Sequence, residues 1–214
     1  YGDHRDLHLS LRRQRQMCIR DSLNSAPEFM IIKGLDDPLS WAVYANSPSN
    51  YLQLSDTSAS NSSDASNAWN NTAPTSSVFT VKSKATVNES GENYIAYCFA
   101  PVEGYSAMGS YIGNGSDDGT FVYTGFEVAW LMVKKINGSG MPWQIQDATR
   151  SPFNDAKHVL MANYSWAEAS ANPNMDLLSN GFKPRRGSGY FNSSGDTFIY
   201  LAFASNPFKT ARAR

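Results

Sequence analysis

Long apolar runs, cysteine and histidine are the features that this sequence has little of. No apolar run approaches the about 18 residues that a membrane-spanning helix needs, so we expect no membrane insertion. The chain has two Cys and three His, and only Cys98 and His158 lie beyond residue 22. A single cysteine in this part of the chain excludes an intrachain disulfide framework.

The first 22 residues have no apolar periodicity and are dense in charge, with five Arg and three Asp. Their sequence reads as a translated sequencing-library adapter. Tyr1–His8 matches one end of the adapter, Arg12–Ser22 matches the transposase end, and Leu9–Leu11 has the length of the index between them. We interpret residues 1–22 as an adapter artefact in a metagenomic sequence, and expect them not to pack into the fold. The alternative, a basic arm that binds nucleic acid, does not explain this order of blocks. The natural protein is then expected to extend upstream of Leu23.

Positive charge is scarce beyond this segment. Of the 18 Lys+Arg and 19 Asp+Glu of the chain, 13 and 16 follow residue 22, which gives this part a formal net charge of −3. A nucleic-acid-binding surface needs clustered positive charge, so we expect no nucleic-acid partner. Asn, Ser, Thr, Gly and aromatic residues are abundant instead, a mixture that is typical of strands joined by polar turns.

Three blocks of sequence recur in the same order at offsets of 101 to 104 residues. In the clearest block, a Ser-Gly turn precedes an alternating strand, and six of 13 positions are identical. The matching blocks are Ala26–Lys33 with Glu127–Lys134, Trp41 with Trp143, and Asn88–Ala100 with Asn192–Ala204. The sequence therefore predicts two tandem repeats, residues 23–107 and 108–214.

Each repeat is expected to consist of strands. Apolar side chains alternate between two faces in Tyr94–Ala100, and Phe29–Ile32 is a short apolar run of the kind buried on both faces of a sheet. Asn163–Ala171 is the best candidate for a short helical turn. The second repeat opens with Gly109–Phe126, whose counterpart would lie upstream of Leu23, so we expect the first repeat to be truncated and less stable. We predict an all-β chain of two tandem β-sandwich-like repeats.

No combination of residues specifies a catalytic site. His158 has no counterpart in the first repeat, and a histidine at the surface or at a strand end is a simpler interpretation than a catalytic base. A glycosidase needs two carboxylates that face each other across a cleft. The acidic residues available for such a pair, none singled out by its spacing, are Asp147, Asp155, Glu168 and Asp176. We therefore expect that the protein is not an enzyme.

The segment Asn114–Gly119 resembles a calcium-binding loop, because oxygen-bearing side chains alternate in it. The twelfth position of such a loop is Gly125 here, so the bidentate Glu is missing. We interpret the segment as a hairpin turn and expect no metal and no cofactor. Cys98 aligns with Ala202, and two small residues at one repeat position indicate a buried thiol rather than a reactive one.

Four aromatic residues could stack on a sugar, namely Trp69, Trp143, Trp166 and Tyr164, and two of the tryptophans are the best candidates for ligand contact. Trp143 is expected in the core because Trp41 repeats it, whereas Trp69 and Trp166 lie in polar segments and have no repeat partner. Function concentrates on loops, and an aromatic ring offers an apolar face with a polar edge. Trp69 and Trp166 are therefore the candidate carbohydrate contacts.

A set of motifs spans the chain beyond Leu23. The motifs are Trp69–Phe79, Val87–Gly91, Tyr94–Tyr105, Gly109–Ser116, Phe121–Phe126, Leu178–Lys183, and Asn206–Lys209 with Ala211–Arg214. As a set they resemble a domain of unknown function that is common in tail and virion structural proteins of marine tailed bacteriophages. The resemblance implies a virion location and a structural or adhesive role, and it implies no catalytic residues. Phe182–Arg186 departs from the usual strand pattern, because Pro184 removes a ladder donor, so we expect an edge or bulged strand there.

We therefore expect a virion structural protein of a tailed bacteriophage, a tail or tail-fibre module with a role in host attachment. Its expected partners are other virion proteins, host surface glycans and further copies of itself. Two alternatives stay open. A lectin-like carbohydrate-binding module would show Trp69 or Trp166 exposed beside a groove, and a polysaccharide depolymerase would show two carboxylates facing each other in a cleft.

Overall fold

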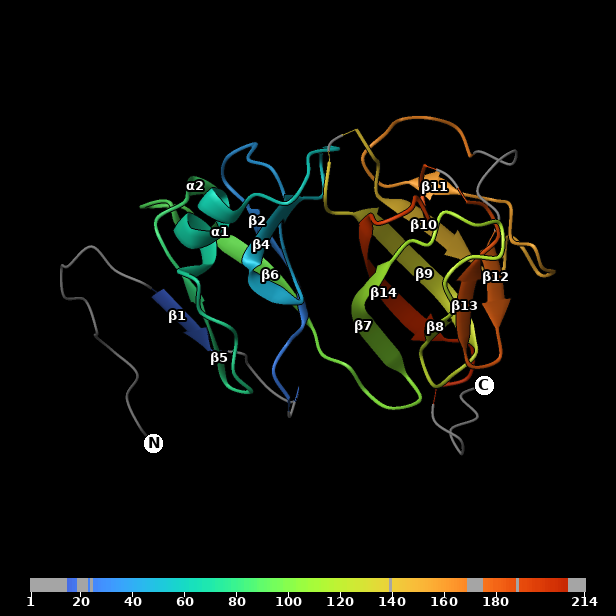
Figure 1. Cartoon of the computed structure of the whole chain (residues 1–214). Helices are drawn as coiled ribbons and strands as arrows, with labels where there is room; N and C mark the ends of the chain where they lie inside the picture. Colours follow the sequence, from blue (N-terminus) through green and yellow to red (C-terminus); the bar gives the residue numbers. More distant parts are fainter. Residues whose placement is uncertain are drawn as a thin grey trace.

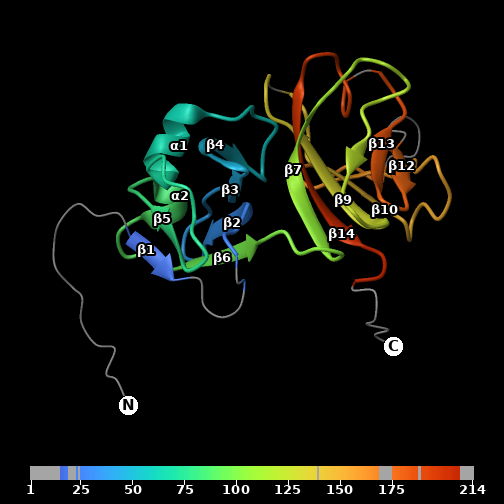
Figure 2. The same ribbon diagram turned by 60° about the horizontal axis from the view of Figure 1, so that its bottom comes forward.

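The computed structural model describes residues 15–18, 23, 25–138, 140–168, 175–187 and 189–207. These residues form β-strands and two short helices, so the predicted all-β class is confirmed. A four-stranded sheet from the first half of the chain and a five-stranded sheet from the second half lie at the centre (Figure 1). Smaller elements cover the outer face of each sheet, and the two inner faces pack against each other (Figure 2).

The sheet of the first half has the strand order β4–β3–β2–β6, with all neighbours antiparallel. Its strands are β2 (Phe29–Gly34), β3 (Ala42–Ala45), β4 (Ser47–Gln53) and β6 (Tyr94–Phe99). The apolar residues of β2 and β3 are buried on both faces, as the continuous apolar run in β2 predicts. A single residue, Asn46, joins β3 to β4 at a φ of 57°, a left-handed conformation that asparagine tolerates.

Helices and one strand cover the outer face of this sheet. These elements are α1 (Ser62–Trp69), β5 (Val78–Val81) and α2 (Ala85–Asn88). The Asn61 side chain caps α1 by accepting a hydrogen bond from the backbone N of Asp64 (3.0 Å). Trp69 at the end of α1 packs edge-on against Tyr44 of β3, with ring centroids 5.7 Å apart. The first half is therefore a sheet covered by helices, unlike the two-sheet sandwich expected from the sequence.

A further strand comes from the segment interpreted as an adapter. The main chain of β1 (Arg15–Cys18) pairs antiparallel with β5, while residues 1–14 and 19–22 lie outside the described residues. The expectation that residues 1–22 take no part in the fold is thus wrong for these four residues. Ladder hydrogen bonds use main-chain groups, so a short stretch without proline can form them whatever its side chains.

The sheet of the second half has the order β11–β10–β9–β14–β7. Its strands are β7 (Ser106–Ile112), β9 (Val128–Lys135), β10 (Gln144–Asp147), β11 (Leu160–Met161) and β14 (Thr197–Ala204). A three-stranded sheet covers its outer face, in the order β12–β13–β8. That sheet consists of β8 (Val122–Tyr123), β12 (Met175–Leu178) and β13 (Gly181–Pro184). Between the two sheets Tyr111 stacks on Phe198 at 5.1 Å, and its hydroxyl donates to the carbonyl of Phe191 (2.8 Å). The second half is therefore a β-sandwich.

Two local expectations for the second half concern Pro184 and the segment Asn163–Ala171. Pro184 does not mark an edge strand, because β13 is the central strand of its sheet. The proline stands at the end of β13, beyond the residues that pair with β8, where its missing N–H removes no bond to that strand. The predicted helical turn at Asn163–Ala171 is absent from residues 163–168, and residues 169–174 lie outside the described part.

The two large sheets meet through a shared apolar core. Trp143 lies in this core, as predicted, with its ring edge-on to Phe29 at 6.2 Å. Its indole N–H donates to the carbonyl of Gln53 (2.8 Å), at the end of β4. Lys134 of β9 is also fully buried and donates through Nζ to the carbonyl of Thr57 (3.1 Å). Polar bonds as well as apolar contacts therefore join the halves.

The two large sheets share one pairing register when the matched blocks are aligned. Phe29 lies opposite Phe99 in the first sheet, and the matching Trp130 lies opposite Phe203 in the second. The next pairs correspond in the same way, namely Met30–Cys98 with Leu131–Ala202, Ile31–Tyr97 with Met132–Leu201, and Ile32–Ala42 with Val133–Gln144. Strands β4, β3, β2 and β6 thus correspond to β11, β10, β9 and β14.

Candidate functional site

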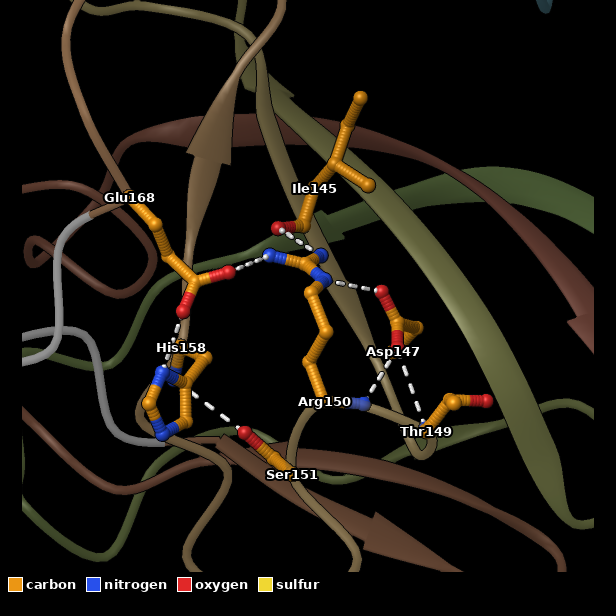
Figure 3. A network of polar contacts seen from close by, with 7 residues as sticks. All are labelled: Ile145, Asp147, Thr149, Arg150, Ser151, His158 and Glu168. Atoms are coloured by element: carbon orange, nitrogen blue, oxygen red, sulfur yellow. Dashed lines mark hydrogen bonds and ion pairs between the residues drawn. The ribbon is translucent and has the colours of Figure 1, made fainter.

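Four polar side chains meet beside the end of β10 (Figure 3). Arg150 lies at the centre, and its Nε donates to Asp147 Oδ2 (2.5 Å) while its Nη1 donates to Glu168 Oε2 (3.0 Å). The Nδ1 atom of His158 lies 2.6 Å from the other carboxylate oxygen of Glu168. We call these four residues the Arg150 cluster. It joins the loop after β10 to the segment that follows β11.

Main-chain hydrogen bonds hold the loop that carries the cluster. Asp147 Oδ1 accepts from the backbone N of Thr149 (3.0 Å) and of Arg150 (2.8 Å), which turns the chain sharply after β10. Arg150 Nη2 donates to the carbonyl of Ile145 (3.3 Å), within β10 itself. Ser151 Oγ accepts from the backbone N of His158 (3.2 Å), so it bonds to the main chain of the histidine. The arrangement is therefore anchored on a strand.

Both carboxylates of the cluster favour the ionised form. Hydrogen bonds from Arg150 and then from His158 hold the pKa of Glu168 below its ordinary value. Burial alone would raise the pKa of Asp147, but hydrogen bonds from the backbone and side chain of Arg150 outweigh it, and the pKa lies below its ordinary value. A glycosidase acid needs a raised pKa in order to carry a proton at neutral pH. Neither carboxylate has that property here.

The structure brings together two of the four carboxylates considered for a glycosidase pair. Asp147 and Glu168 lie on either side of Arg150, so a guanidinium occupies the space that a sugar would need between them. Asp155 instead pairs with Lys157 (3.3 Å), and Asp176 pairs with Arg185 (3.4 Å). The His158–Glu168 pair could not be predicted from the sequence, because the two residues lie ten positions apart in loops with no periodic pattern.

An exposed aromatic pair precedes Glu168 in the chain. Tyr164 and Trp166 stack with ring centroids 4.3 Å apart and planes 12° apart. The Trp166 side chain is 64% exposed, and Tyr164 is also exposed. The backbone N of Tyr164 donates to the carbonyl of Met161 (3.2 Å), which ties the pair to the end of β11. Both rings are among the aromatic residues that the sequence offers for sugar stacking, and Trp166 is one of its two best candidates for ligand contact.

Residues 13–207 match a family described as "Domain of unknown function (DUF7483)". The chain belongs to this family. The match begins inside the segment interpreted as an adapter, and it covers both large sheets. No curated protein and no protein of solved structure matches the chain significantly.

The second tryptophan candidate of this DUF7483 chain is wrong. Trp69 is 1% exposed and belongs to the core between α1 and the first sheet. Its indole N–H donates to the carbonyl of Asn50 (2.9 Å), so both its apolar face and its polar edge have partners inside the protein. The polar residues around Trp69 did not indicate that it is exposed. They lie on the outer side of α1, whereas Trp69 lies on its buried face together with Ala65 and Ala68.

The segment Asn114–Gly119 of the DUF7483 chain is a closed turn. Asp118 lies within 2.5 Å of Lys183 Nζ, and hydrogen bonding to this lysine lowers the pKa of the carboxyl group. Asp117 accepts from the backbone N of Gly187 (2.9 Å), and Asn114 Oδ1 accepts from Asn192 (2.7 Å). These oxygens therefore serve hydrogen bonds and ion pairs within the protein. Over the residues that the structure describes, no group of three or more His, Cys, Asp and Glu side chains is placed to hold a metal ion.

Cys98 of β6 is half-buried, and burial raises the pKa of its thiol to about 11. The thiol is therefore protonated at neutral pH, in agreement with an unreactive cysteine. Within the described part of the chain, no helix is both long and apolar enough to cross a membrane.

Proposed function

We propose that this chain is a structural module of a tailed-bacteriophage virion, in the tail or tail fibre, and that it contributes to host attachment by binding surface glycans. The exposed Tyr164–Trp166 stack carries the attachment part of the proposal. The resemblance of the sequence motifs to a domain of phage tail proteins supports the virion location. Packing of both halves through one apolar core supports a mechanical role for the rest of the chain.

The aromatic pair suits carbohydrate because sugar rings present apolar C–H faces. Trp166 offers a flat, solvent-facing surface, and stacking against Tyr164 holds that surface in place. Specific polar groups fix the orientation of a ligand that an apolar surface holds. Glu168 follows Trp166 by two residues, and its carboxylate is itself held by Arg150 and His158. The segment thus combines an apolar surface with fixed charge.

The test is binding of the full chain to an array of bacterial surface glycans, followed by titration of the best ligand. We expect Trp166→Ala to weaken binding about tenfold, a loss of about 1.4 kcal/mol. Tyr164→Ala should weaken it less, because it removes the support of the tryptophan rather than the contact. Tyr123→Ala is the matched control, since Tyr123 is also a largely exposed aromatic residue and lies on β8. Equal affinity of the Trp166 variant and the wild-type chain would refute the assignment of the pair.

The virion location has a separate test. The genes that flank this one on the same stretch of DNA should encode tail or capsid proteins. Flanking genes of cellular carbohydrate metabolism would instead favour the second candidate, a lectin-like module outside a virion. The same aromatic pair favours that candidate, so the glycan experiment alone does not separate the two.

A further inference from the structure

Strand β6 lies at the edge of its sheet, whereas its counterpart β14 lies between β9 and β7. The correspondence rests on the pairing register, in which Phe99 lies opposite Phe29 and Phe203 lies opposite Trp130. Strand β7 pairs with β14 along its whole length, from Ser106 to Ile112. Among the described residues, no strand takes the corresponding place beside β6.

The main chain at this edge is arranged to accept a strand. The backbone N of Leu35 donates to the carbonyl of Asn93 (2.8 Å), in register with the ladder between β2 and β6. Residues of an antiparallel strand bond alternately to one side and the other. Counting from Asn93, the residues that direct their N–H and C=O groups away from β2 are Tyr94, Ala96 and Cys98. The corresponding residues of β14 direct theirs toward β7.

The side chains of β6 also lack the cover that β14 receives. Ile95 and Tyr97 are 37% and 45% exposed, whereas the corresponding Ile199 and Leu201 are 1% and 2% exposed. Edge strands commonly prevent pairing with charged residues or proline. The sequence of β6, Tyr-Ile-Ala-Tyr-Cys-Phe, contains neither. Over the residues that the structure describes, the edge of β6 is therefore apolar and carries neither of these protecting features.

We propose that the outer edge of β6 binds an extended strand of a second polypeptide, with the sequence pattern of β7 and antiparallel to β6. In this pairing the residue at the position of Ala107 lies opposite Cys98, as Ala107 lies opposite Ala202 on β14. The side chain at the position of Met108 then covers Tyr97, as Met108 lies opposite Leu201. The proposal rests on the main chain and on β7, and does not depend on glycan binding.

The fit differs from that of β7 itself at one position. Gly109 lies opposite Tyr200, and a Cβ atom at Gly109 would lie 2.9 Å from the tyrosine hydroxyl. The residue of β6 that corresponds to Tyr200 is Ala96, whose side chain leaves that space open. A strand that binds β6 should therefore carry a larger apolar side chain where β7 has glycine.

The experiment uses the full chain and synthetic peptides with the sequence of residues 105–113, measured by fluorescence anisotropy. We expect one peptide to bind per chain, and the peptide with Gly109→Val to bind at least threefold more tightly than the unchanged one. Ala96→Pro in the protein should weaken binding at least tenfold, because it removes an outward N–H that β2 does not use. Absence of binding, or affinity unaffected by Ala96→Pro, would overturn the proposal. If the unchanged peptide, which has glycine at position 109, bound more tightly than the Gly109→Val peptide, the open space inferred beside Ala96 would be wrong.

A cross-link in the unchanged β6 tests the register without relying on a proline variant. A peptide with Ala107→Cys, supplied as an activated disulfide at about pH 9 so that part of the Cys98 thiol is ionised, should form a disulfide with Cys98 and release the activating thiol when the two residues lie opposite each other. A peptide with Met108→Cys places its thiol on the other face of the sheet and is the matched control. Equal cross-linking of the two peptides would contradict the proposed register.

Discussion

Lys134 is a buried cation between the two large sheets, and its removal should change how stability depends on pH. Its side chain is fully buried, and Nζ donates to the carbonyls of Met141 (2.5 Å) and Thr57 (3.1 Å). Burial lowers its pKa from the ordinary 10.5 to about 8, and the attraction of Asp56 does not compensate. The folded protein therefore releases this proton at a lower pH than the unfolded chain does.

The direction of the effect follows from proton binding. Between pH 8 and pH 10.5 the unfolded chain keeps a proton on Lys134 that the folded chain has lost, so the free energy of unfolding rises with pH in this window. Across the whole window the rise amounts to about 3 kcal/mol. Cys98 and Tyr44 act in the opposite direction, because burial raises their pKa values to about 11 and about 12. The contribution of Lys134 to the pH dependence of stability can therefore be measured only by comparing the wild type with a variant that lacks this lysine.

The variant is Lys134→Met, compared with the wild-type chain by urea unfolding at several pH values from 7 to 10.5. We expect the stability of the wild type relative to the variant to increase by about 3 kcal/mol over this range. Lys33→Met is the matched control, since Lys33 corresponds to Lys134 in the register but is only partly buried. A difference between wild type and Lys134→Met that stays constant with pH would refute the reasoning.

Three further predictions concern the core, the edge strand and the Arg150 cluster. Trp143→Ala should lower the free energy of unfolding by about 3 to 5 kcal/mol, and Trp41→Ala by clearly less, because Trp143 is 1% and Trp41 is 38% exposed; equal losses in chemical unfolding would contradict this. Hydrogen exchange should be faster at the amides of β6 than at those of β14, since β14 is paired on both sides and β6 on one; equal protection would mean that β6 is covered in solution. The purified chain should not hydrolyse bacterial polysaccharides, and turnover that disappears in Glu168→Gln would show this to be wrong.

The strands were predictable because their apolar residues follow the period of a sheet. The block Asn88–Ala100 contains β6 and the block Asn192–Ala204 contains β14, and both strands pair in the register that the alignment implies. Trp143 is buried as predicted, but the matching Trp41 is 38% exposed, so the match alone does not account for the burial of Trp143. A face that must be buried leaves a regular pattern in the sequence, because a shift by one residue would expose all of its side chains.

The covering of the first sheet was not predictable in the same way. The helix α1 reads Ser-Ser-Asp-Ala-Ser-Asn-Ala-Trp, and its buried face consists of Ala65, Ala68 and Trp69. These residues have helical spacing, but two alanines and one tryptophan among polar residues form a weak pattern. The sequence feature that could have predicted the start of α1 was Asn61, a residue type that commonly caps helices, three positions before Asp64, whose backbone N it accepts from. The Arg150 cluster left no signal, since its members come from loops placed by the fold.

The difference between the halves indicates where function is to be sought. Asn46 alone joins β3 to β4, whereas Ala148–Val159 join the corresponding β10 and β11. This longer loop carries Arg150 and His158, and Asp147, which anchors it, corresponds in the register to Ala45. The first half therefore has neither the loop nor its anchor. Corresponding strands with unequal loops are what two repeats would show if only the second carried the proposed site, because loops on a rigid sheet tolerate insertion and carry binding residues. The second half, between β10 and β12, is for this reason the part in which substitutions should alter binding without altering the sheets.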